Sequence, residues 1–153
     1  MNTGHRGARF RFATIVAMPK TKTRRIVIVG QGYVGLPLAM RAVEVGHEVV
    51  GIDVDETRVK LLDAGESYVE DITPEELQAA VASGRYTASA QAKAAAGFDV
   101  AVITVPTPLR EGNPDLRYIE DAARMLCRYL RPGATVVLES TTYPGTTEER
   151  VGP

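Results

Sequence analysis

A run of four branched apolar residues, Ile26 to Val29, leads directly into the sequence Gly-Gln-Gly-Tyr-Val-Gly at residues 30–35. A short apolar run of this kind is typical of a strand that is buried on both faces of a parallel sheet. Three glycines at this spacing, between a strand and a helix, are typical of a βαβ unit that binds a dinucleotide. The chain is therefore expected to open its fold with a strand, a tight turn and a helix.

Each glycine of this motif has its own expected task. Gly30 should permit the tight turn at the end of the strand, and Gly35 should let the helix pack closely against that strand. Gly32, which lacks Cβ, should let the main chain approach a pyrophosphate. The N–H groups and the positive dipole end of the helix would face the phosphates. The alternative is a plain turn with a close helix contact.

An acidic residue, Asp53, ends the next predicted strand and lies 18 residues after Gly35. This offset is close to the roughly 20 residues expected for a carboxylate that binds the adenosine ribose 2′-OH. A carboxylate there repels a 2′-phosphate and so favours NAD over NADP, whereas Arg58 weakens that preference because an arginine can accept the phosphate. The alternatives are a solvated loop acid for Asp53 and a surface helix charge for Arg58.

Strand and helix patterns alternate along the chain. Strands are predicted at 26–29, 48–53, 86–88, 98–105 and 135–139, and helices at 33–45, 56–62, 73–83, 89–96 and 115–130. The apolar stripe predicted for the first helix consists of Val34, Leu38, Ala42 and Val45. The stripe predicted for the last helix consists of Ile119, Ala122, Ala123, Leu126 and Leu130. Thr73 and Glu76 form a capping box, and Asp115 is a candidate cap for the last long helix. This alternation predicts a Rossmann-type α/β fold, a doubly wound parallel sheet in three layers. A second capping box, Thr146 to Glu149, stands close to the end of the sequence, so we expect a fold truncated after its fifth strand.

The composition limits the kind of protein. A length of 153 residues with 44% hydrophobic residues predicts one domain. The single cysteine, Cys127, excludes an internal disulfide framework and favours a cytoplasmic protein. We expect Cys127 to be a buried structural residue beside the apolar stripe of its helix. No apolar run is long enough for a membrane span, and no His, Cys and Asp residues have metal-ligand spacing, so neither membrane insertion nor a metal is predicted.

The first 25 residues are basic, with seven Lys and Arg and no acidic residue. This leaves 11 of the 18 basic and all 19 acidic residues in the remainder, a net charge of −8. Such a segment can bind nucleic acid or an anionic membrane, or it can be an extension from an early start codon, with Met18 as the natural start. Few aromatic residues accompany its charges, so nucleic-acid binding is not favoured. We expect residues 1–24 to be a disordered extension and 25–153 to form the domain.

Four segments in order make the chain resemble the NAD-binding domain of the UDP-glucose/GDP-mannose dehydrogenase family, from about residue 25 to residue 150. They are residues 30–37, 53–59, 105–108 and 138–147. Within that family the chain is most similar to UDP-N-acetylglucosamine 6-dehydrogenases, through Pro-Thr-Pro-Leu at 106–109, Pro-Asp-Leu at 114–116 and the hydroxyl-rich run at 139–147. The resemblance therefore implies a nucleotide-sugar dehydrogenase of polysaccharide biosynthesis.

The resemblance also implies the chemistry. The family oxidises the C6 alcohol of a nucleotide sugar to a carboxylate with two NAD in succession, through a cysteine nucleophile. That cysteine and its lysine and asparagine helpers lie beyond residue 153, so the chain alone is expected to bind NAD without turning over a UDP-sugar. Thr141 is implied as an auxiliary residue near the reacting centre that helps to position a proton or water. The implied cofactor-binding residues are Gly30, Gln31, Gly32, Tyr33, Val34, Gly35, Asp53, Arg58, Val105, Pro106, Thr107, Ser140 and Thr141.

Partners and alternatives follow from the same resemblance. It implies a UDP-sugar substrate and a homo-oligomeric enzyme that assembles through regions absent here, with no nucleic-acid or membrane partner. One alternative is a non-catalytic NAD-binding fragment, a remnant or a regulatory sensor. Another is a dehydrogenase of the hydroxyacid or 6-phosphogluconate type, against which the segment Ser-Thr-Thr-Tyr-Pro-Gly at 140–145 argues.

Overall fold

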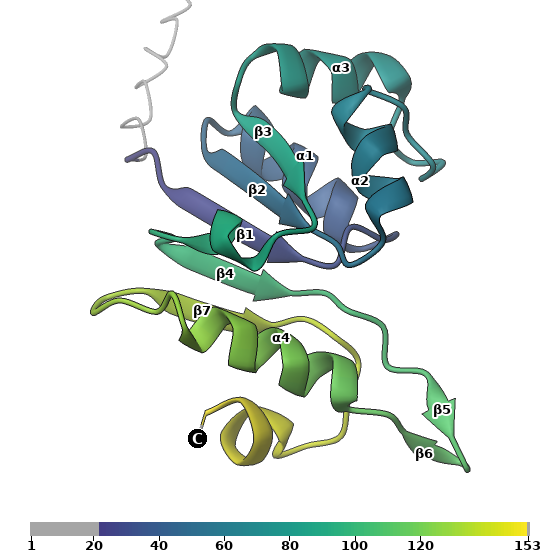
Figure 1. Ribbon diagram of the computed structural model, residues 1–153, viewed down its shortest axis with the longest axis vertical. Coiled ribbons are helices and arrows are strands. Elements are labelled where there is room, and N and C mark those ends of the chain that lie inside the picture. The colour runs from purple at the N-terminus through teal and green to yellow at the C-terminus, as the bar shows by residue number, and fades with distance from the viewer. Residues whose placement is uncertain (1–21, 153) are drawn as a thin grey trace, which may run out of the picture.

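A parallel sheet forms the centre of the computed structural model, which describes residues 22–152 (Figure 1). Within those residues its strands are β1 (Arg25–Val29), β2 (Glu48–Ile52), β3 (Tyr86–Ser89), β4 (Val100–Ile103) and β7 (Thr135–Leu138), in the order β3-β2-β1-β4-β7. Val27 of the central strand faces Val50 on one side and Ala101 on the other. The order therefore reverses between β1 and β4, which confirms the predicted doubly wound fold. Most of the basic segment, residues 1–21, lies outside the described residues.

Helices cover both faces of the sheet, which confirms the three layers (Figure 1). On one face, α1 (Gly35–Glu44), α2 (Glu56–Asp63) and α3 (Pro74–Ala82) bury Leu36, Leu62 and Leu77 against the sheet. On the other, the 3-10 helix η1 (Ala92–Ala95) and α4 (Arg117–Cys127) pack on a second apolar cluster that includes Phe98 and Leu126. Between residues 22 and 152, no helix is both long and apolar enough to cross a membrane.

The predicted stripe of α1 is wrong in most of its members. Val34, Leu38 and Val45 are exposed, whereas the helix buries Leu36, Ala39, Met40 and Ala42. Apolar residues occur all around this helix, so several stripes fit the sequence at helical spacing. The close contact of the Gly35 backbone with the turn after β1 decides which face points to the sheet.

The predictions for the ends and lengths of the other elements are confirmed at some positions and wrong at others. The cap at Thr73 is confirmed, since its hydroxyl accepts from the N–H of Glu76 at 3.2 Å. The alanine-rich helix predicted at 89–96 is only the single turn η1, because alanine propensity alone does not hold a helix this short. The predicted strand 98–105 shortens to β4. Helix α4 ends at Cys127 rather than Leu130, which is exposed.

A small antiparallel hairpin precedes α4 and was not predicted. Its strands are β5 (Leu109–Arg110) and β6 (Asn113–Pro114), and it projects away from the main sheet (Figure 1). The turn holds Glu111 at φ +53° and Gly112 at φ +83°. Two positive φ values in succession fit a tight hairpin turn, and the two-residue strands are too short to show alternation in the sequence.

Two further expectations about side chains are wrong. Thr146 does not cap η2 (Thr147–Val151): its hydroxyl donates to the Tyr143 carbonyl at 2.8 Å and bonds to the Thr142 hydroxyl, because the side chain turns back into its own loop. Cys127 is exposed rather than buried, because it lies beside the buried stripe of α4 and not within it.

Asp115 accepts from the N–H of Arg117, the first residue of α4, at 3.1 Å, although the capping position itself is Leu116.

Candidate cofactor site

The glycine turn lies between β1 and α1, at the carboxyl edge of the sheet and beside the point where the strand order reverses. Gly30 has φ +96° and donates its N–H to the Ile52 carbonyl at 2.7 Å. A Cβ on Gly35 would lie 1.8 Å from the Gly30 carbonyl oxygen. These observations confirm the tight turn at Gly30 and the close packing at Gly35. A Cβ on Gly32 would meet no described heavy atom within 4 Å, so this main chain faces open space.

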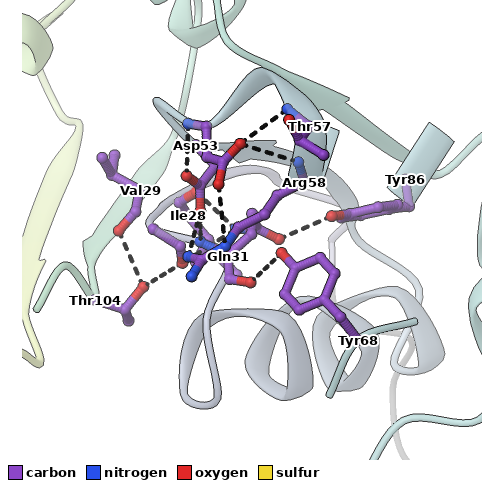
Figure 2. A network of polar contacts seen from close by, with 11 residues as sticks. Ile28, Val29, Gln31, Asp53, Thr57, Arg58, Tyr68, Tyr86 and Thr104 are labelled. Carbon is purple, nitrogen blue, oxygen red and sulfur yellow. Dashed lines mark hydrogen bonds and ion pairs between the residues drawn. The ribbon is translucent and has the colours of Figure 1, made fainter. Parts of the chain in front are cut away.

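The Asp53 carboxylate stands beside this turn and is held by main-chain donors (Figure 2). Its Oδ2 accepts from the N–H of Gln31 at 2.9 Å, and its Oδ1 accepts from the N–H of Asp55 at 3.0 Å. The residue is only 6% exposed. Asp53 is therefore not the solvated loop acid that was the alternative, and its carboxylate is fixed in direction.

Arg58, from the first turn of α2, lies over the same carboxylate. Its Nη1 is 3.7 Å from Oδ2 of Asp53, and its Nε is 3.7 Å from Oδ2 of Asp55. The guanidinium carbon lies 5.5 Å from the centre of the Tyr68 ring, a cation–π distance. The side chain is half-exposed. Arg58 is therefore paired with two carboxylates at the candidate site rather than being a free surface charge.

Two tyrosines and a threonine complete the turn, and the sequence analysis missed all three. The Tyr68 hydroxyl donates to the Gln31 carbonyl at 2.5 Å, and burial together with the nearby Asp53 charge raises the pKa of Tyr68 to about 12. The Tyr86 hydroxyl donates to Oε1 of Gln31 at 2.8 Å, and burial raises the pKa of Tyr86 as well. Thr104 donates to the Gly30 carbonyl. Their spacing in the sequence carries no signal, because each comes from a different element.

The loops that follow β4 and β7 meet next to the turn. The Thr107 hydroxyl donates to the Thr141 carbonyl at 2.7 Å, and the Ser140 hydroxyl donates to the Val105 carbonyl at 2.7 Å. These two bonds bring together four residues that the resemblance implies as cofactor-binding, namely Val105, Thr107, Ser140 and Thr141. Thr141 and Pro106 are exposed there.

A match to a family model places this chain among known proteins: the model described as the UDP-glucose/GDP-mannose dehydrogenase family, NAD binding domain, covers residues 24–153. The chain belongs to this family. The domain's cofactor is NAD. The chain is 36% identical over 128 residues to a UDP-N-acetyl-D-mannosamine dehydrogenase of Pyrococcus horikoshii, an alignment of 82% of this chain and 30% of the relative. It is 38% identical to an NDP-N-acetyl-D-galactosaminuronic acid dehydrogenase of Ralstonia nicotianae, again over 82% of this chain and 30% of the relative.

Solved structures of the family share this fold. A ternary complex of GDP-mannose dehydrogenase from Pseudomonas aeruginosa matches with a TM-score of 0.77 and 38% identity, over 83% of this chain and 30% of that one. A UDP-glucose dehydrogenase from Pyrobaculum islandicum matches with a TM-score of 0.78 and 37% identity, over 88% and 33%. The chain thus spans about a third of the length of these family members.

The residues of this family domain fit a dinucleotide. Among the described residues, none caps the first turn of α1 through a side chain, and none of that turn is acidic, so its N–H groups and dipole favour an anion. Open space lies in front of Gly32, and the Asp53 carboxylate, which can accept hydrogen bonds from hydroxyl groups, lies beside it. Tyr33 and Val34 are exposed at the same turn. The Gln31 side chain is the exception, because it is fully buried and points away from this space.

Cys127 lies at the opposite edge of the sheet. Helix α4 starts after the loops at the carboxyl edge and runs back, so its last residue precedes the amino end of β7. The single cysteine of the chain is therefore remote from the glycine turn. Groups of three or more His, Cys, Asp or Glu residues that could hold a metal ion do not occur in the described part of the chain.

Proposed function

We propose that this chain is the NAD-binding part of a dehydrogenase that oxidises the C6 alcohol of a UDP-N-acetylhexosamine to the uronate. Family membership supports the dehydrogenase, and the relatives named for N-acetylmannosamine and N-acetylgalactosaminuronic acid support an N-acetylated sugar. UDP-N-acetylglucosamine, the sugar that the sequence motifs favour, belongs to this class and stays a prediction. The rest of the enzyme would supply the sugar site and the nucleophilic cysteine.

The observation that carries the proposal is the buried Asp53 carboxylate beside an open glycine turn. When bound, NAD accepts the hydride from the sugar carbon. On this chain, the N–H groups at the start of α1 would hold the diphosphate, and Asp53 would accept hydroxyl protons of the adenosine ribose. Its fixed direction favours this role, since a buried carboxylate that already has two donors keeps further lone pairs for a ligand.

The reacting end of the cofactor would lie over the two loops that follow β4 and β7. Val105, Pro106, Thr107 and Ser140 would line the nicotinamide groove. The hydroxyls of Thr107 and Ser140 are engaged with main-chain carbonyls, so they fix the shape of the groove. Thr141 donates no side-chain hydrogen bond to a described residue, and its exposed hydroxyl is available to position a proton or water as the auxiliary residue.

Titration calorimetry tests the proposal on the chain as it stands. We expect saturable heat with NAD⁺, much weaker binding of NADP⁺, and loss of NAD binding in Asp53→Ala. We also expect no NADH absorbance when the chain is given NAD⁺ and UDP-N-acetylglucosamine or UDP-N-acetylmannosamine. Absence of heat with NAD⁺ on folded protein would remove the proposed function, and NADH production by the chain alone would show that it carries its own catalytic groups.

A further inference from the structure

Gln31 stands in the middle of the nucleotide-binding motif, yet its side chain is 0% exposed. It points into the layer between the sheet and helices α1 to α3, where the neighbouring cluster includes Ile28 and Tyr86 (Figure 2). Burial of an amide costs free energy unless its polar atoms are bonded. A residue at this position that served only to approach a ligand would have no reason to bury an amide.

The structure provides a partner for each polar atom of this amide. Nε2 donates to the Ile28 carbonyl at 2.9 Å, and Oε1 accepts from the Tyr86 hydroxyl at 2.8 Å. The room for the amide comes from Gly51 of β2, where a Cβ would lie 2.5 Å from Cδ and Oε1 of Gln31 and 2.7 Å from the Tyr86 hydroxyl. Three residues from three elements therefore form one fitted polar pocket beneath the turn.

The main chain of Gln31 is held on both sides of the same residue. Its N–H donates to Oδ2 of Asp53 at 2.9 Å, and its carbonyl accepts from the Tyr68 hydroxyl at 2.5 Å. The hydrogen bonds of the buried side-chain amide and the two main-chain hydrogen bonds together restrict the conformation of the main chain at Gln31. Gly32 follows directly in the chain, so the same anchoring sets where the open main chain stands relative to the carboxylate.

We infer that Gln31 is a positioning residue for NAD: its buried amide, seated on Tyr86 in the gap left by Gly51, fixes the distance between the phosphate-facing turn and the Asp53 carboxylate. The inference rests on the proposed NAD binding and deepens it. Gln31 would act through other groups, since its own N–H is used by Asp53 and its side chain faces inward. A site ordered in advance loses less entropy on binding, so disordering the turn lowers affinity without removing any contact to the ligand.

Four variants separate positioning from stability. Tyr86→Phe leaves Oε1 of Gln31 buried without its donor, Gln31→Met removes the amide at similar size, and the double variant makes both partners apolar. Tyr129→Phe is the matched control, because Tyr129 packs against the α4 side of the sheet and loses the same hydroxyl far from the turn. Each is measured by calorimetry with NAD⁺ and by thermal unfolding, at a temperature where all are folded.

We expect Tyr86→Phe and Gln31→Met each to weaken NAD binding by about tenfold, which corresponds to the loss of roughly one hydrogen bond to a buried group. The double variant should regain thermal stability relative to Tyr86→Phe, since an apolar pair leaves no unsatisfied atom, yet its NAD affinity should stay low. Tyr129→Phe should bind NAD as the unchanged chain does. In amide hydrogen exchange without NAD⁺, the main-chain N–H of residue 31, which donates to Oδ2 of Asp53, should exchange faster in Gln31→Met than in the unchanged chain.

Two results would overturn the inference while leaving the proposed function intact. One is unchanged NAD affinity in Gln31→Met. The other is an affinity that recovers together with stability in the double variant, since that pattern belongs to a residue with a structural role alone. Failure of the unchanged chain to bind NAD⁺ would instead remove the proposed function, and the inference with it.

Discussion

The Thr104 hydroxyl donates to the Gly30 carbonyl oxygen at 2.8 Å, so the end of β4 is tied to the turn that follows β1. The same hydroxyl lies 3.0 Å from the Val29 carbonyl oxygen. β1 and β4 are the two strands at which the order of the sheet reverses. The hydrogen bond thus closes the base of the crevice in which dinucleotides bind in open α/β sheets.

Thr104→Val should weaken both the fold and the site. The change keeps the shape but leaves the partly buried Gly30 carbonyl with only the long 3.4 Å bond from Nε2 of Gln31, at a cost of about 1–3 kcal/mol in the free energy of unfolding. We expect a lower midpoint in denaturant unfolding and a several-fold weaker NAD⁺ affinity by calorimetry. Thr104→Ser retains the hydroxyl and should behave almost as the unchanged chain, so equal losses in both variants would contradict this role.

Gly32→Ala and Gly35→Ala should separate ligand space from packing. A Cβ at Gly32 meets open space, so the variant should fold with unchanged stability and lose at least about tenfold in NAD⁺ affinity, because the methyl group occupies the approach to the diphosphate. A Cβ at Gly35 overlaps the Gly30 carbonyl, so that variant should lose about 1–3 kcal/mol of unfolding free energy. Calorimetry and thermal unfolding on the same samples check both. Normal NAD binding by Gly32→Ala would contradict the assignment.

Asp53→Ser should shift the cofactor preference towards NADP. In the unchanged chain the carboxylates of Asp53 and Asp55 compensate Arg58, and Asp53 repels a 2′-phosphate. The substitution keeps an oxygen near the Gln31 N–H but releases the guanidinium from one of its two carboxylates, so NADP⁺ affinity should rise by about tenfold while NAD⁺ affinity falls. Competition calorimetry measures both. The gain should disappear in Asp53→Ser with Arg58→Ala; if it persists, Arg58 is not the acceptor of the phosphate.

The Tyr68 hydroxyl should lose its proton at a higher pH than an ordinary tyrosine, and this ionisation should reduce the stability of the fold at high pH. Burial, and next the Asp53 charge, raise its pKa from the ordinary tyrosine value of 10.0 to about 12. A raised pKa in the folded state means that this contribution to stability is fully present below pH 10 and is lost as the pH rises towards 12. The difference in phenolate absorbance between the unchanged chain and Tyr68→Phe should have its midpoint near that pKa. A midpoint near 10 would show that the Tyr68 hydroxyl is free in solution.

The sequence was informative where local geometry alone imposes a residue type. Gly30 and Gly35 could be predicted because a positive φ and an atom-to-atom backbone contact exclude other side chains. The stripe of α1 could not, because apolar residues surround that helix and only its docking distinguishes Leu36 from Leu38. The position of Asp53 could be predicted from its offset, but its burial depends on donors that folding brings from another segment.

The hydrogen bonds that hold Gln31 in place could not be predicted from the sequence, for the same reason. Tyr68 and Tyr86 reach Gln31 from 37 and 55 residues away, so no periodic pattern connects them. Gln31 itself was predicted as a contact to the cofactor, and only the fold shows that its side chain faces inward. Sequence patterns describe which atoms a strand or helix presents, whereas a pocket between elements depends on how they pack.

The missing side chain at Gly51 has a consequence for evolution. The side chains of an interior strand normally occupy the space between that strand and the helices above it. At Gly51 of β2 this space is occupied instead by the Gln31 side chain, which comes from the turn after the neighbouring strand β1. Positions 31, 51 and 86 should therefore vary as a group among related chains. Where a relative has a bulky residue at the position of Gly51, a small or apolar residue should stand in place of Gln31, and the tyrosine hydroxyl should be dispensable.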